Sequence, residues 1–511
     1  MATVIINKFD GGHSEDIRTF ETDKCQQCLN FNTYRNPHKL IPIRDNVEGT
    51  LTDETVTMSQ IQISDVSVNA LTGIEGLIAQ GYDITGSGTV SSSPAFFKAS
   101  SMNGSWTYNA SASHTKTDGT MVTYVKKPYI LSQGSGGSSG NYYLQELTSG
   151  GTVNIRGTVT PSAVTSGYSY PVPKPVVHPS DTKLYYGVGD KIRVWDGSSD
   201  SASSLVISNG LCLTSFTYYG EYVAFAVKPL SVIGSSYAVL WDKNLTSTTV
   251  NNVIDFGVGD LQILENISGS LVGIVSPSMF ASSTIDYKVD IKLYEGGAVR
   301  TIKSIPLTST SSGYSILKAK TSDKLYFVIG GDTTAIWAVY KNKEGNWVCT
   351  QERYLLDGST TGAGLIDSIA SISIVGDYFF MGFIDGNGTY RLRTTSISAD
   401  YTFTSKYITT INPNMPNGDR YKDKELKAIQ IAYTGNNATN SIALKYAVDT
   451  TTMTSVISSS NVTGEGFIEA TAEDGGAVFK TGKEFQFQVE STGGVEIKEI
   501  RYRYETTNSQ V

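Results

Sequence analysis

The chain has 511 residues, a formal net charge of −8 and only 17% charged residues. This length is too great for one compact core, so two or three domains are expected. The dispersed acidity argues against a surface that grips nucleic-acid phosphates, which needs clustered lysine and arginine, but it is compatible with a wall past which DNA slides. The 50 glycines and 30 tyrosines favour many short strands joined by tight turns, so we predict an all-β fold.

The first 60 residues form a segment of their own. Their start lacks a positive region followed by a long apolar run, so no secretion signal is expected. No run in the chain reaches the roughly 18 apolar residues of a membrane-spanning helix. The run 28–42 (CLNFNTYRNPHKLIP) is distinctive. The segment 1–60 either supplies the strand that closes a propeller ring or reaches a neighbouring subunit. A strand takes only about 5–6 residues, so most of the segment is available to contact a neighbour.

Within this run we predict an assembly segment. Its residues are Asn30, Phe31, Asn32, Pro37, His38, Lys39 and Leu40.

The clearest pattern is an internal repeat over residues 61–410. A nearly continuous apolar strand, a turn and a second strand that alternates better recur seven times, at intervals of roughly 46 to 53 residues. The first strands span 76–80, 124–131, 184–187, 222–227, 271–275, 325–329 and 378–383. The second strands span 94–98, 142–146, 192–196, 238–242, 290–294, 337–341 and 390–394. A four-stranded propeller blade takes roughly 40 to 50 residues, so the repeat predicts a β-propeller of about seven blades.

The pattern changes beyond residue 410. Residues 412–419 (NPNMPNGD) have the composition of a linker. Strands are then predicted at 427–433, 442–448, 484–489 and 495–504. Alternation is strong here, since Ile429, Ile431 and Tyr433 share one face, as do Phe485, Phe487 and Val489, which is typical of strands with one buried face. We therefore predict an antiparallel β-sandwich over 420–511.

The sequence offers little that indicates chemistry. Cys25 and Cys28 form a CxxC motif without a second ligand pair nearby, so they are predicted to be free thiols, with a structural zinc site as the alternative. Cys212 and Cys349 lie in apolar runs and are predicted to be buried. The four histidines are scattered, with no spacing suited to a metal. We predict no catalytic, cofactor-binding or metal site.

Acidic and aromatic residues leave two alternatives. Asp196 and Asp242 each follow a tryptophan at the end of a strand, where an aspartate typically begins a turn. Trp106 and Trp347 are candidates for stacking on sugars. A carbohydrate-binding adhesin or receptor-recognition module is therefore the alternative to a structural role.

Both ends of the chain resemble tailed-bacteriophage virion proteins. The resemblance lies in residues 5–18 (IINKFDGGHSEDIR), 30–32 and 36–42 at the start, and in 479–505 at the end. Among these proteins the chain is most similar to tail nozzle or packaged-DNA stabilisation proteins, in which a propeller is followed by a small sandwich. The resemblance implies a ring that continues the portal channel and holds the genome in.

A place in the virion tail follows as an expectation. The chain would be made in the cytoplasm of the host bacterium and would form a ring near the DNA exit channel. Its expected partners are other copies of itself and neighbouring tail or portal-adaptor proteins. Genomic DNA would be passing cargo, and no insertion into a membrane is expected.

Overall fold

The structure is a computed structural model, and it describes residues 2–51, 104–162, 170–354, 366–409 and 422–506, with short gaps inside these ranges. Every element in this part of the chain is a β-strand, which confirms the predicted all-β fold. Within the same ranges, no helix is long and apolar enough to cross a membrane. The chain divides into two compact units, which comprise 1–46, 335–354 and 395–511, and 47–334 and 355–394.

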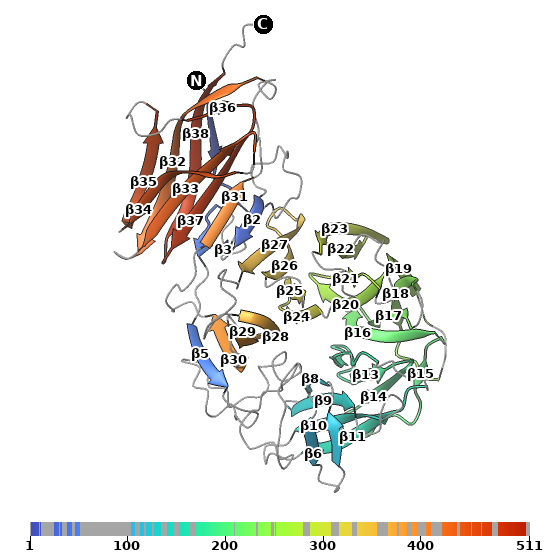
Figure 1. Cartoon of the computed structure of the whole chain (residues 1–511). Helices are drawn as coiled ribbons and strands as arrows, with labels where there is room; N and C mark the ends of the chain where they lie inside the picture. Colours follow the sequence, from blue (N-terminus) through green and yellow to red (C-terminus); the bar gives the residue numbers. More distant parts are fainter. Residues whose placement is uncertain are drawn as a thin grey trace. The chain divides into compact units, whose positions relative to one another are not determined.

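Six four-stranded sheets follow one another along the middle of the chain, as the colours of Figure 1 show. The first three are β8 (Gly119–Tyr124), β9 (Lys127–Gln133), β10 (Tyr142–Leu147) and β11 (Val153–Val159); β12 (Val176–Val177), β13 (Leu184–Val188), β14 (Lys191–Trp195) and β15 (Leu205–Val206); and β16 (Leu211–Tyr219), β17 (Tyr222–Pro229), β18 (Ser235–Trp241) and β19 (Asn252–Val258). The next two are β20 (Asp260–Ile267), β21 (Ser270–Ser276), β22 (Lys288–Glu295) and β23 (Ala298–Pro306); and β24 (Ile316–Lys320), β25 (Lys324–Ile329), β26 (Ala335–Lys341) and β27 (Trp347–Tyr354). The last sheet is β28 (Ile366–Val375), β29 (Tyr378–Asp385), β30 (Tyr390–Thr395) and β5 (Asn46–Leu51).

These sheets have the arrangement of propeller blades. The first strand of each sheet contacts the first strand of the next, along the series β8, β12, β16, β20, β24 and β28. The last sheet takes its fourth strand, β5, from the N-terminal segment, so that β5 joins distant parts of the chain as ring closure requires. A further hairpin consists of β6 (Gly104–Thr107) and β7 (Ser113–Lys116).

The predicted strand pairs are the second and third strands of these blades. β17 and β21 are buried along nearly their whole length, whereas β22 alternates between buried and more exposed positions. Tight turns also join the third strands of the blades to the fourth. Gly296, between β22 and β23, has φ = 63°, which glycine adopts without strain. The first predicted pair, 76–80 with 94–98, lies outside the described residues, so the number of seven blades stays a prediction.

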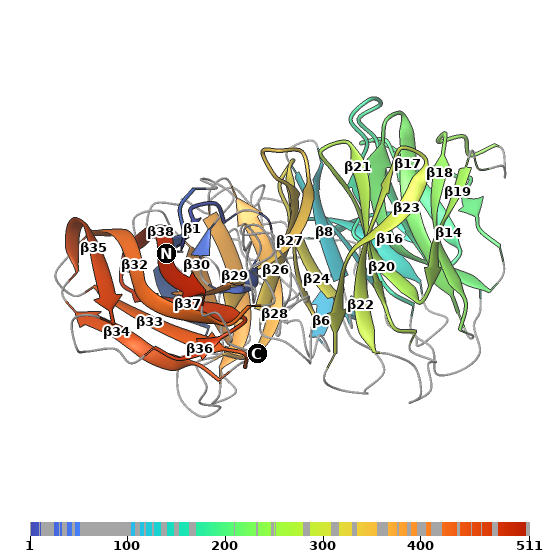
Figure 2. The same ribbon diagram turned by 90° about the horizontal axis from the view of Figure 1, so that it is seen from above.

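Two five-stranded sheets pack face to face as a β-sandwich, and Figure 2 shows β32, β35 and β38 in one layer and β33, β34 and β37 in the other. One sheet consists of β1 (Ala2–Ile6), β38 (Glu496–Thr506), β32 (Lys424–Asn436), β35 (Thr463–Thr471) and β36 (Thr481–Gly482). The other consists of β2 (Cys25–Leu29), β31 (Ser405–Thr409), β37 (Phe485–Thr492), β33 (Ser441–Val448) and β34 (Thr454–Ser460). The short strands β3 (Phe31–Asn32) and β4 (Ile41–Pro42) pair with each other.

The sandwich core follows the predicted alternation. Ile429 and Ile431 of β32 and Phe485 and Phe487 of β37 are fully buried. The ring of Phe487 lies 4.7 Å, centroid to centroid, from that of Tyr502 in the opposite sheet. Three strands outside the predicted range of 420–511 also join the sandwich, namely β1, β2 and β31. The segment 1–60 therefore contributes strands to its own chain at β1, β2 and β5.

Candidate functional site

Polar and charged side chains gather on the first strands of three successive blades, β16, β20 and β24. Glu265 of β20 is almost completely buried, with its side chain 5% exposed. The ammonium group of Lys318 lies 2.7 Å from one carboxylate oxygen, and that of Lys320 lies 2.5 Å from the other. The hydroxyl of Thr217, on β16, donates to the second oxygen at 3.2 Å. We call these four side chains the Glu265 cluster.

The lysines of the cluster have different environments. Lys318 has a side chain 15% exposed and also donates to the hydroxyl of Ser215 at 3.0 Å. Lys320 is more open, at 36%, and its ammonium group lies 5.8 Å from the centroid of the Tyr218 ring. Ser215 in turn bridges to the backbone of Leu264, so that the cluster joins β24, β20 and β16.

Electrostatics keep Glu265 ionised. Burial alone raises the pKa of a carboxyl group, but the ammonium groups of Lys318 and Lys320 outweigh it and lower the pKa of Glu265 to about 2. Burial lowers the pKa of Lys318, and its contact with Glu265 opposes that shift. A carboxylate held in this way is unsuited to act as a general acid near neutral pH, because it is hardly ever protonated there.

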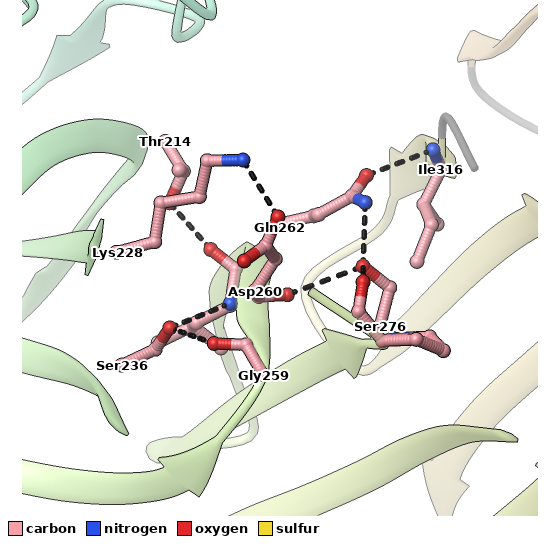
Figure 3. A network of polar contacts seen from close by, with 10 residues as sticks. Thr214, Lys228, Ser236, Gly259, Asp260, Gln262, Ser276 and Ile316 are labelled. Carbon is pink, nitrogen blue, oxygen red and sulfur yellow. Dashed lines mark hydrogen bonds and ion pairs between the residues drawn. The ribbon is translucent and has the colours of Figure 1, made fainter. Parts of the chain in front are cut away.

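A second polar network lies beside this cluster in the same blades (Figure 3). Lys228 of β17 forms a buried ion pair with Asp260 of β20 at 2.7 Å. The amide of Gln262 donates to the Ser276 hydroxyl at 2.6 Å and accepts from the backbone N–H of Ile316 at 3.2 Å, which links β20 to β21 and β24.

The backbone between β19 and β20 is held by further hydroxyl groups of this network. The hydroxyl of Ser236 donates to the carbonyl of Gly259 and accepts from the N–H of Leu261. The hydroxyl of Thr214 donates to the carbonyl of Leu261. Together with the bond between Gln262 and Ile316, these bonds connect three successive blades, so the network stabilises the packing of the blades.

The other buried carboxylates of the described residues are also paired. Glu146 accepts from Arg156 at 2.7 Å, and Asp190 accepts from the backbone N–H and the hydroxyl of Ser162 at 2.9 and 2.6 Å. A pair of carboxylates facing a sugar across an open cleft, as glycoside hydrolysis uses, needs one of them to be protonated. Glu265 and these two groups are instead held by cations or hydrogen-bond donors.

The predicted assembly segment lies partly against its own sandwich. Phe31 and Leu40 are buried in the sandwich core, and Leu40 exchanges two backbone hydrogen bonds with Ile497 of β38, at 2.9 and 3.0 Å. Lys39 pairs with Glu496 at 3.0 Å, and His38 is exposed. Phe31 and Leu40 therefore contribute to the fold of their own chain. Asn30 and Pro37 lie outside the described residues, and only the backbone of Asn32, in β3, is described.

The aromatic candidates are placed as follows. Trp347, in β27, is only 9% exposed, and the ammonium group of Lys341 lies 6.0 Å from its ring centroid. This burial leaves little of the ring free to stack on a sugar. Trp106 belongs to β6, where only the backbone is described.

The cysteines and histidines form no metal site in the described part of the chain. All four cysteines are buried and outside any disulfide. Cys25 and Cys28 both face the sandwich core because a β-bulge at Gln26 shifts the register between them. His178 is buried, whereas His13 lies outside the described residues and His114 is described only by its backbone in β7.

The aspartates that follow tryptophans begin turns, as the sequence predicts. Asp196 accepts hydrogen bonds from the backbone N–H groups of Ser198 and Ser199 at 2.8 and 2.7 Å, and these bonds lower its pKa. Asp242 accepts from the N–H of Asn244 at 3.1 Å.

The Glu265 cluster and the Lys228–Asp260 pair did not emerge from the sequence. A signal exists in retrospect, since Gln262 and Glu265 stand among the buried apolar residues of β20, and Lys318 follows two buried apolar residues. A charged residue inside an apolar strand indicates either a turn or a buried ion pair, and the sequence alone does not identify the partner.

Comparisons with known proteins give a resemblance of fold only. No protein-family profile matches the chain, and no curated protein matches its sequence. Among solved structures, a periplasmic gluconolactonase of Pseudomonas aeruginosa is 11% identical with a TM-score of 0.38, over 63% of this chain and 99% of that one. An exo-β-1,3-galactanase of Phanerochaete chrysosporium is 6% identical (TM-score 0.29; 78% and 98%), and an α-L-arabinanase of Penicillium chrysogenum is 10% identical (TM-score 0.30; 54% and 91%). These neighbours are enzymes, but likenesses this low carry no argument about activity.

Proposed function

We propose that the chain is a structural component of a bacteriophage tail, which forms a ring at or near the DNA exit channel and helps to retain and release the genome. The observation that carries this proposal is the meeting of the two chain ends that resemble virion proteins. β1 and β38 are neighbours in one sheet, with Ile5 opposite Arg501 and Ile6 opposite Ile500. The two resembling segments therefore belong to one folded element.

The polar interior of the propeller supports a role by shape, without catalysis. Glu265 is held between two lysines and Asp260 is paired with Lys228, so these buried carboxylates join blades. Cross-links of this kind suit a part that resists pressure from packaged DNA. In this proposal the partners are other copies of the chain and neighbouring tail or portal-adaptor proteins, and DNA passes as cargo.

The experiment is a fractionation of phage particles from a lysate that expresses the chain. An antibody raised against the purified chain is used on gradient fractions, together with mass spectrometry of the intact particles. We expect the chain to co-sediment with particles at a fixed ratio to the major capsid protein. Recovery only among soluble host proteins would overturn the proposal, and a hit on a glycan array would favour the adhesin instead.

A further inference from the structure

The outer face of the sheet β1–β38–β32–β35 carries a pocket. Tyr502 and Tyr504 of β38 are buried inward, so the alternating Arg501 and Arg503 face outward. The pocket has a volume of about 260 Å³. It is lined by Thr3, Ala428, Gln430, Glu469, Arg501 and Arg503. The short side chain of Ala428, opposite Arg503 in the ladder, leaves the hollow between longer neighbours.

The two arginines give this pocket a preference for carboxylates. Arg501 pairs with Glu499 at 2.7 Å and Arg503 pairs with Glu469 at 2.5 Å, while both side chains remain 41% exposed. A guanidinium has five N–H donors, more than one carboxylate contact uses. A further carboxylate entering the pocket can therefore bond to either arginine without displacing Glu499 or Glu469.

Apolar side chains flank the pocket on both sides. Ile5 of β1, directly opposite Arg501, is 43% exposed, and Phe467 of β35, opposite Ala432, is 65% exposed. The two strands that carry them are three strand spacings apart, which is about 14 Å. A fitting partner thus has an acidic side chain between two apolar side chains roughly this far apart. We call this surface the sandwich face.

The chain itself carries such a pattern, on the last strand of the β16–β19 blade. Val253 and Val258 of β19 are 52% and 66% exposed, and Asp255 between them is exposed as well. Ile254 and Phe256 are buried, so Val253 and Asp255 share the outward side. The five residue-to-residue steps from Val253 to Val258 span about 16 Å in an extended strand.

We propose that β19 of one copy docks on the sandwich face of a second copy, with Asp255 bonded to Arg501 or Arg503 and the two valines against Ile5 and Phe467. Two different surfaces meet in this contact, so it is head-to-tail and can close into a ring. The inference deepens the proposed function and rests on it, because it names the surfaces through which ring subunits meet. Large exposed apolar side chains next to arginine are also typical of protein interfaces.

The test is a site-directed disulfide between two single variants of the full chain. Asp255→Cys and Gln430→Cys are purified separately, mixed at high concentration and oxidised gently. The native cysteines are buried, and each variant carries one new thiol, so a dimer that appears only on mixing joins two copies. The matched control replaces Asp255→Cys by Glu221→Cys, at an exposed acidic residue on the turn before β17.

We expect the mixture of Asp255→Cys and Gln430→Cys to form the linked dimer at least tenfold faster than the control mixture. Phe467→Ser, placed in the Gln430→Cys chain, should slow it severalfold while the unfolding temperature stays unchanged. Equal rates for both mixtures, or cross-linking that is indifferent to Phe467→Ser, would overturn the proposed contact. A failure here with the chain still present in particles would reject this interface alone, whereas absence from particles would reject the proposed function.

Discussion

Replacing Glu265 by glutamine tests whether the Glu265 cluster holds the propeller together. Glu265→Gln keeps the size of the side chain but removes the charge between Lys318 and Lys320. Lys318, with a side chain 15% exposed, then lacks its counter-charge. Breaking a buried ion pair by removing one partner costs about 3 to 5 kcal/mol. Lys320 is more than one-third exposed, so solvent screens its share and the lower end, about 3 kcal/mol, is expected.

The pKa of Glu265 gives a similar magnitude. A fall from 4.5 to about 2 corresponds to roughly 3 kcal/mol at about 1.4 kcal/mol per unit. Because the folded pKa lies below the unfolded value, this stabilisation is complete above pH 4.5 and is lost as the pH falls from 4.5 towards 2. Glu265→Gln should therefore weaken the fold at neutral pH and flatten its acid-unfolding profile in that window.

Differential scanning calorimetry measures the effect. The unfolding entropy grows with chain length, so for a propeller over 61–410 a loss of about 3 kcal/mol lowers the transition by about 4 °C. The double variant Glu265→Gln/Lys318→Met should regain part of that loss, since it leaves no buried charge without a partner. A Glu265→Gln transition within 1 °C of the parent chain, or a double variant as unstable as the sum of both changes, would refute the structural role of the cluster.

Three further predictions concern other parts of the fold. Lys228→Met leaves the buried Asp260 without its cation and should lower the free energy of unfolding by about 3 kcal/mol. The control Lys288→Met, at a lysine whose side chain is 48% exposed, should change it by less than about 1 kcal/mol, and urea titration of both variants measures the difference. Burial, reinforced by the charge of Lys243, lowers the pKa of His178, so the fold should lose stability as the pH falls below 6.5. His178→Gln should reduce that loss in melting curves between pH 7 and 5. An unchanged dependence of the melting temperature on pH would contradict this role of His178. Gly493 has φ = 79°, and a Cβ there would lie 2.1 Å from the Asn440 side-chain oxygen, so Gly493→Ala should lower the free energy of unfolding by about 2 to 3 kcal/mol. The control Gly464→Ala, whose Cβ would have no atom within 4 Å, should lower it by about 1 kcal/mol. Equal losses for the two variants would be inconsistent with this geometry.

The sequence predicts the strands that are apolar throughout or in which apolar and polar residues alternate. β17 and β21 are covered on both faces, so their apolar runs stand out, and the alternation in β32 and β37 marks the sandwich core. The first strands of the blades were missed because polar residues such as Glu265 interrupt them. These residues pair with side chains about 50 positions away, which no local pattern reveals.

Long-range pairing also explains why the places of the N-terminal strands could not be predicted from the sequence. β1 pairs with β38 from the other end of the chain, and β5 completes the last blade. The bulge at Gln26 breaks the period of two in β2, so Cys25 and Cys28 share a face although their spacing predicts opposite ones. The candidate site was hidden for the same reason, because its members come from three separate blades.

Electron microscopy of tagged phage particles tests the central claim most directly. A gold label on a tag after Val511, at the C-terminal end of the chain, would mark its position in intact particles. We predict a label at the tail, with the chain in several copies around the axis of the DNA channel. Particles that lack the label everywhere, while the tagged chain accumulates in the lysate, would contradict the account.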